Sequence, residues 1–236
     1  MTEAEWLASE DIEAMFGVVR ARSKRRRSRL FAVACCRAID PALPDPRSQR
    51  AISIAELHAD GSATDAELAS VMLGAHEVVL ARASDPAVIE AAASASEGLT
   101  RKAAGMRQWS YRMGMERAAE CVAVPHPYRA AVQVGELVRS RLFHFQGPDR
   151  GAQASILRDI FGHIFRPVAF SPSWRTSVAV ALAAQMYESR DFGAMPILAD
   201  ALQDAGCDSA DVLDHCRGEG PHVRGCWVVD LVLGKE

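Results

Sequence analysis

The sequence predicts an all-α protein, a multi-helix bundle or irregular helical array without a substantial sheet. Apolar residues make up 49% of the chain but aromatic residues only 6%. Much of the apolar share is alanine, which favours closely packed helices over a β-sandwich. Helix-start signals recur along the chain, and the one ambiguous apolar run, at the C-terminus, has no partner strand in view.

The first half of the chain carries several helix starts. Thr2 and Glu5 have the spacing of a capping box, in which two side chains satisfy free backbone N–H groups of the first turn. Thr64 and Glu67 repeat that spacing, and Asp45 before a proline is typical of an N-cap. We expect helices at the N-terminus and over residues 23–39, 45–60 and 64–82, followed by an alanine-rich helical stretch over 87–124.

The second half is punctuated by prolines and glycines. The stretch "FHFQGPDRG" indicates a turn or linker, and it divides the chain into an N-terminal helical region, 1–147, and a C-terminal helical module, 148–236. Gly206 and Gly218 each end a helix. We expect helices over residues 125–143, 152–161, 173–189 and 195–205, a short one before Gly218, and a last one in "CWVVDLVLG".

Charge, hydropathy and cysteine content bear on the partners and the cellular location of the protein. The formal net charge of −3 provides no global attraction to nucleic acid or anionic lipid. No apolar run approaches the roughly 18 to 20 residues of a membrane span, and the acidic N-terminus lacks the positive flank of a signal peptide. We therefore expect a cytoplasmic protein without a membrane partner, whose six cysteines are reduced thiols.

Residues 214–227, "DHCRGEGPHVRGCW", hold two histidines and two cysteines. His222 and Cys226 are four positions apart, so on a helix they would share a face and could bind one zinc ion. Cys207 or Cys216 would complete a tetrahedral site. The paired C-x2-C of strong zinc patterns is absent, and the alternative is a glycine-shaped turn followed by core residues. A nucleophilic cysteine activated by a neighbouring histidine is the weaker alternative.

Two basic stretches, 20–29 and 101–117, suggest contact with nucleic-acid phosphates. The first contains seven cations, and the second interleaves cations with aromatic side chains that can stack on bases. The alternative is that the cations are solvated or pair with acidic residues of the same chain, five of which lie in the first 13 positions. The candidate nucleic-acid-binding residues are Arg25, Arg26, Arg27, Arg29, Arg107, Trp109 and Arg112.

Both ends of the chain resemble an uncharacterised bacterial family of hypothetical proteins. The similar stretches are "MTEAEWL", "RLFAVACCR" and "AELHADGSATDAELA" at the N-terminus and "LRDIFGHIFRPV", "MPILADALQDAGC" and "HCRGEGPHVRGCWVVDLVLGK" at the C-terminus. Together they cover roughly the first 70 and the last 80 residues. The resemblance implies a helical module, sometimes joined to other domains, and brings no activity, catalytic residue or ligand with it.

The leading functional expectation is a non-enzymatic helical module that binds another protein. No group of residues in the sequence forms a recognisable catalytic set, whereas helical surfaces of uneven charge suit protein recognition. A nucleic-acid-associated regulator that uses the two basic stretches is the first alternative. A zinc-binding structural or catalytic protein that uses Cys207, Cys216, His222 and Cys226 is the second.

Overall fold

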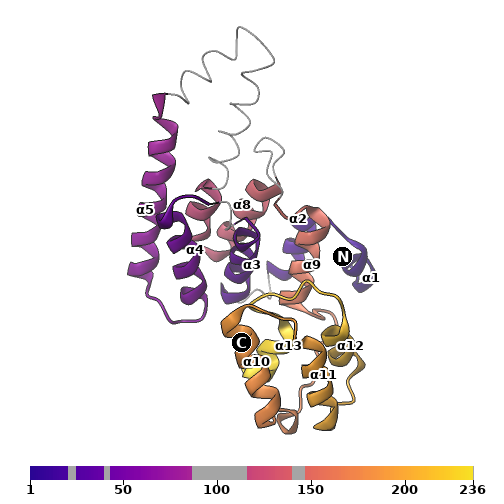
Figure 1. Cartoon of the computed structure of the whole chain (residues 1–236). Helices are drawn as coiled ribbons and strands as arrows, with labels where there is room; N and C mark the ends of the chain where they lie inside the picture. Colours follow the sequence, from indigo (N-terminus) through magenta and orange to yellow (C-terminus); the bar gives the residue numbers. More distant parts are fainter. Residues whose placement is uncertain (21–24, 40–42, 87–115, 140–146, 236) are drawn as a thin grey trace. The chain divides into compact units, whose positions relative to one another are not determined.

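The predicted all-α class is confirmed. The computed structural model describes residues 1–20, 25–39, 43–86, 116–139 and 147–235, and these contain helices and no strand (Figure 1). The helices are α1 (Glu3–Ala8), α2 (Ile12–Arg20), α3 (Arg25–Arg37), α4 (Pro46–Ala59), α5 (Asp65–Ala83), α8 (Pro127–Arg139), α9 (Arg150–Phe161), the 3-10 turn η3 (Pro172–Trp174), α10 (Ser177–Ser189), α11 (Met195–Asp204), α12 (Ala210–Arg217) and α13 (Trp227–Leu233). Among these helices none combines the length and the apolar composition that a bilayer crossing requires.

The helix starts that the sequence marks are formed as predicted. Thr2 and Thr64 each cap a helix, and in both cases a glutamate three residues later completes the capping box. The side chain of Asp45 accepts the backbone N–H of Arg47 at the start of α4, whose first residue is a proline. These caps depend on residues two or three positions apart, so the local sequence specifies them.

Three parts of the chain differ from the predicted helices or lie partly outside the described residues. The N-terminal segment contains two helices, α1 and α2, where the sequence indicated one short helix. Helix α10 begins at Ser177, four residues later than predicted, because Thr176 caps it and the preceding residues form η3. Most of the predicted helical stretch 87–124 lies outside the described residues, and of its remainder 116–122 is helical.

The chain divides into two compact units. The middle unit is Ser28–Arg150, and the terminal unit joins Met1–Arg27 to Gly151–Glu236. The second boundary lies three residues from the predicted one, at 147/148. The first 27 residues differ from the prediction, since they belong with the C-terminal segment. The physical reason is tertiary: the guanidinium of Arg158 donates hydrogen bonds to the carbonyls of Trp6 and Ser9.

Within the middle unit, α4 and α5 run antiparallel and side by side (Figure 1). Their connection passes through Gly61, which adopts the left-handed backbone conformation that glycine tolerates best. Helix α3 presents an almost entirely buried surface, including the side chain of Arg29. Its Nη1 donates to the carbonyls of Val122 and Val124, and its Nη2 to that of Pro125, so a buried cation is satisfied by backbone dipoles.

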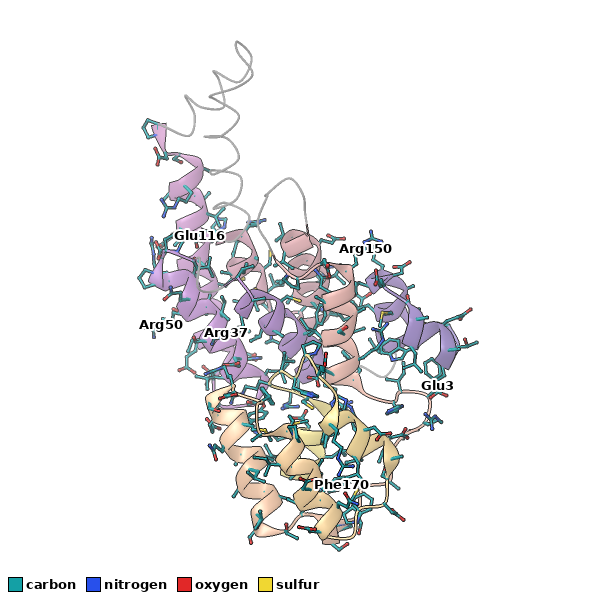
Figure 2. The ribbon with its side chains drawn as sticks, turned by 45° about the vertical axis from the view of Figure 1, so that its right-hand side comes forward. Glu3, Arg37, Arg50, Glu116, Arg150 and Phe170 are labelled. Carbon is teal, nitrogen blue, oxygen red and sulfur yellow. The ribbon has the colours of Figure 1, made fainter. Side chains whose placement is uncertain are left out.

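Within the terminal unit, α10, α11, α12 and α13 enclose a hydrophobic core (Figure 1). Trp174, Tyr187 and Trp227 are its large aromatic members. Phe170, which is labelled in Figure 2, packs edge-on against Trp174 with ring centroids 5.2 Å apart. Arg26, which belongs to the same unit, forms a bidentate ion pair with Asp230 and donates a hydrogen bond to the hydroxyl of Tyr187.

Candidate metal centre

Four potential metal ligands converge in the terminal unit. Asp159 lies near the end of α9, His215 in α12, and Cys226 is the N-cap of α13. His222 lies in the loop 218–225 that connects the last two helices. One donor atom from each side chain lies within 4.8 Å of all the others. The four donors therefore lie close together, although they come from three segments: α9, α12 and the connection between α12 and α13.

The separations between these atoms suit a small metal ion. The Oδ1 atom of Asp159 lies 3.0 Å from Nδ1 of His222 and 3.1 Å from Nε2 of His215, which in turn lies 3.2 Å from Sγ of Cys226. In a tetrahedral zinc site with bonds of about 2.0 to 2.3 Å, nitrogen and oxygen ligands lie roughly 3.3 Å apart, and nitrogen and sulfur roughly 3.6 Å. These three separations are slightly shorter than those of that geometry, and the other pairs of donor atoms lie within 4.8 Å of one another.

The loop is shaped to aim His222 at Asp159. The second carboxylate oxygen of Asp159 accepts the backbone N–H of Val223 at 2.9 Å, which holds the loop against α9. Gly220 has a φ of +88°, and a Cβ placed there would lie 2.9 Å from the backbone nitrogen of His222. Only glycine fits this turn without strain, so the loop conformation requires glycine at position 220.

Burial and hydrogen bonding act against each other on the ionisable groups. Burial raises the pKa of Asp159, but hydrogen bonds and charge from His215 and His222 outweigh it and hold the pKa below its ordinary value. Burial lowers the pKa of His222, but the hydrogen bond and charge of Asp159 outweigh it and raise the pKa. Burial raises the pKa of Cys226 well above its ordinary value, so its thiol is neutral unless a metal replaces the proton.

The geometry differs from that of a catalytic cysteine. In a cysteine–histidine–aspartate relay, one ring nitrogen faces the thiol and the other faces the carboxylate. Here a single nitrogen, Nε2 of His215, faces both Cys226 and Asp159. Such an arrangement does not relay a proton from the thiol through the ring to the carboxylate. The other ring nitrogen of His222 lies 3.4 Å from the carbonyl of Gly218, the kind of outer contact that orients metal-bound histidines.

A cavity of about 310 Å³ adjoins the cluster. Asp159, His215 and His222 line it, whereas Cys226 is fully buried behind them. The remaining lining residues are Glu3, Trp6, Leu7, Ser155, Arg158, Gly162, His163, Ile164, Phe165, Gly218, Glu219, Gly220, Pro221 and Trp227. The cluster thus lies between the hydrophobic core and a space large enough for a small molecule.

The structure brings together two of the four metal ligands that the sequence suggested. His222 and Cys226 belong to the cluster, but they do not share a helical face, because α13 begins only at Trp227. Cys207 and Cys216 are buried and lie outside the four-residue group. Burial raises the pKa of Cys216 to about 12, so it is a neutral core thiol.

Sequence reasoning missed Asp159 and left His215 outside its ligand set. His215 stands in the stretch 214–227, so this stretch does contain a third member of the cluster, whereas the predicted ligands Cys207 and Cys216 are not members. Asp159 precedes His222 by 63 residues and lies in an ordinary helix, where no spacing pattern marks it. A buried carboxylate with histidine partners is visible only in three dimensions.

The candidate nucleic-acid-binding residues fall into different environments. Arg25 is exposed, but Arg26 is bonded to Asp230 and Tyr187, and Arg29 is buried against backbone carbonyls. Arg27 is half-buried. Arg107, Trp109 and Arg112 lie outside the described residues. Nucleic-acid binding stays a prediction, and the side chains of Arg26 and Arg29 are engaged within the protein.

The terminal unit therefore presents a compact donor set of one carboxylate, two imidazoles and one thiol beside a cavity. No family model, curated protein or solved structure matches the chain.

Proposed function

We propose that this protein binds one divalent transition-metal ion through Asp159, His215, His222 and Cys226. The observation that carries the proposal is the convergence of four donor atoms, from three segments of the chain, within 4.8 Å of one another. Two imidazoles, one thiolate and one carboxylate form a ligand set of intermediate softness. Zinc accepts all three donor types and prefers four of them in a tetrahedral arrangement, so zinc is the ion that we expect.

The competing explanation is a metal-free hydrogen-bond network. Each imidazole can donate an N–H to Oδ1 of Asp159, while Val223 donates to Oδ2, so the buried carboxylate would be satisfied without an ion. This network explains the two histidines and does not require the sulfur. The Sγ of Cys226 contacts the same nitrogen of His215 that faces Asp159. A bound metal ion would account for this sulfur contact as well as for the contacts of both histidines with Asp159.

Metal analysis of protein purified without chelator tests the proposal. We expect about one equivalent of zinc per chain in the unaltered protein and less than about a tenth in Cys226→Ala. Cys216→Ala is the matched control, because it removes another fully buried thiol of the same unit that lies outside the cluster. Less than about a tenth of an equivalent in the unaltered protein, even after exposure to excess zinc and gel filtration, would end the proposal.

Metal removal should also change stability. An ion that binds only the folded state stabilises it by about 4 kcal/mol when its free concentration is a thousand times its dissociation constant. We expect a strong chelator to lower the melting temperature and added zinc to restore it. Cys226→Ala should melt at the same temperature with and without the chelator, because its site no longer holds the ion.

The helical interaction module that the sequence suggested remains a separate prediction. A metal centre between α9, α12 and α13 would brace such a module, so the two functions are compatible. A protein partner and a nucleic-acid partner are distinguished by salt. Binding to generic duplex DNA or single-stranded RNA should weaken steeply with salt if phosphate contacts carry it.

A further inference from the structure

We infer that the metal centre is open to the adjoining cavity, and that the cavity binds a small organic anion which coordinates the metal. The ligand would place a deprotonated, metal-binding group on the ion and an apolar body against the cavity wall. This inference rests on the proposed metal site and adds a binding activity to it. Three observations support it: three of the four donors line the cavity, the cavity walls are largely aromatic and apolar, and an arginine is among the lining residues.

The donors are distributed unevenly around their common point. Asp159, His215 and His222 line the cavity, whereas Cys226 is fully buried and is not among the lining residues. An ion held by all four would have its sulfur ligand on the core side and the cavity on the opposite side. Structural zinc sites have four protein ligands and are enclosed by protein, whereas catalytic sites have three protein ligands and leave a position to water or substrate, sometimes expanding to five ligands. Here the protein supplies four donors, and the cavity beside three of them leaves room for a fifth ligand.

The walls of the cavity suit an apolar molecular body. Trp6 contributes from α1 and Trp227 from α13, with Ile164 and Phe165 from the segment after α9. The ring of Trp227 lies 5.1 Å from that of His215, so the aromatic wall begins beside a proposed ligand. At roughly 30 Å³ for each non-hydrogen atom, a space of about 310 Å³ holds a molecule of about ten such atoms.

The charges of the cavity favour an anion. Asp159 and the thiolate of Cys226 would neutralise a divalent ion. Arg158 adds a positive charge to the wall, and its guanidinium is held there by hydrogen bonds to the carbonyls of Trp6 and Ser9. Of the two other acidic lining residues, Glu3 is paired with Arg166, with Nε and Oε1 2.6 Å apart (Glu3 is labelled in Figure 2), and Glu219 is exposed to solvent.

Spectroscopy of the cobalt-substituted protein tests the inference. Benzohydroxamate is the probe, because it carries an anionic metal-binding group on an apolar ring and has about ten non-hydrogen atoms, the size that the cavity accepts. Benzamide, which keeps the ring and lacks that group, is the control. We expect benzohydroxamate to weaken the visible cobalt bands saturably, as a fifth ligand is added, while the cobalt content stays unchanged. Benzamide should leave the spectrum as it was.

The outcomes separate the inference from the metal proposal. No cobalt uptake overturns both. Stoichiometric uptake with a spectrum that benzohydroxamate does not change overturns only the open site and leaves a closed structural centre. A spectral change that accompanies loss of cobalt also overturns the inference, because the probe then strips the ion instead of binding beside it.

A cavity-filling variant gives a second, independent measurement. Ile164→Trp enlarges a wall residue that is not a proposed ligand, and we expect it to weaken benzohydroxamate binding at least about tenfold with an unchanged cobalt content. Val178→Trp is the control, since Val178 is 61% exposed on α10 and is not a lining residue. Equal probe affinity in both variants would place the probe outside the cavity.

Discussion

His215 and Cys226 meet across the loop that joins the last two helices: Nε2 of the histidine lies 3.2 Å from Sγ of the cysteine. The two residues are separated by 11 positions, and the intervening chain folds back through a glycine-rich turn. The loop is pinned by a backbone hydrogen bond from Val223 to Asp159. The proposed site therefore depends on the loop as much as on the helices, and substitutions in either should affect it.

Asp159→Asn tests the carboxylate as a metal ligand. The amide removes the negative charge and, if it keeps one oxygen on the histidine side, turns a donor toward the N–H of Val223. We expect zinc affinity to fall at least about 100-fold, measured by competition with a chromogenic chelator, because losing a direct ligand costs more than the 10- to 100-fold typical of an outer-shell partner. Asp211→Asn is the control, because Asp211 lies beside His163 and Arg166, outside the four-residue group. Unchanged affinity in Asp159→Asn would remove Asp159 from the ligand set.

Gly162→Ala should destabilise the terminal unit through Trp227. Gly162 has a φ of +63°, and an added Cβ would lie 2.7 Å from Cγ of the indole ring. We expect a loss of about 1 to 2 kcal/mol from the left-handed backbone and about 1 to 3 kcal/mol more from the clash, measured by denaturant unfolding.

Gly206→Ala is the matched control for this clash. Gly206 has a φ of +86° and no atom within 4 Å of the added Cβ, so only the backbone cost applies. The difference between the two variants isolates the contact with Trp227. Equal losses in the two variants would show that the indole ring moves aside without cost.

Asp230→Asn should break a buried ion pair. Nη1 and Nη2 of Arg26 lie 2.5 and 2.9 Å from the two carboxylate oxygens, and Asp230 is fully buried. The substitution takes a buried carboxylate away from the guanidinium of Arg26, so we expect a loss of about 3 to 5 kcal/mol in the free energy of unfolding. Asp200→Asn removes an exposed partner of Arg217 and should cost less than about 1 kcal/mol. Similar losses in the two variants would contradict the importance of burial.

Glu116 should make the stability of the middle unit depend on pH. Glu116, which is labelled in Figure 2, is buried and accepts a hydrogen bond from the hydroxyl of Ser48. Burial raises the pKa of Glu116, and the charge of Asp45 raises it further, while Ser48, Arg82 and Arg47 oppose the shift. A carboxyl group with a raised pKa in the folded state is stabilising when protonated. Stability is therefore complete below the unfolded pKa of about 4.3 and falls as pH rises through the folded value.

Glu116→Gln removes that titration. We expect the unfolding free energy of Glu116→Gln to rise relative to that of the unaltered protein as pH increases from about 4.3 to neutral. Denaturant unfolding monitored by far-ultraviolet circular dichroism at each pH measures this difference. Glu77→Gln is the control, since the Glu77 side chain is 70% exposed and should leave the pH profile unchanged. A constant difference between Glu116→Gln and the unaltered protein at all pH values would show that Glu116 ionises as an ordinary surface residue.

Local sequence determined the helices of this protein. The caps at Thr2, Asp45 and Thr64 each join residues two or three positions apart, so the same few side chains that mark a helix start also form it. Alanine-rich composition then favours helix packing, and the all-α class follows. The membership of the first 27 residues in the terminal unit was not predictable in this way, because it depends on contacts such as that of Arg158 with Trp6.

The candidate site was decided by tertiary structure. The sequence marked His222 and Cys226 because they are close in the chain, but it paired them with Cys207 and Cys216 for the same reason. The folded chain instead brings Asp159 from 63 residues upstream of His222, since α9 supplies the carboxylate that the loop hydrogen-bonds. Helix starts are short-range hydrogen bonds, which spacing reveals. Ligand convergence depends on how separate helices pack, and no short stretch of sequence contains that information.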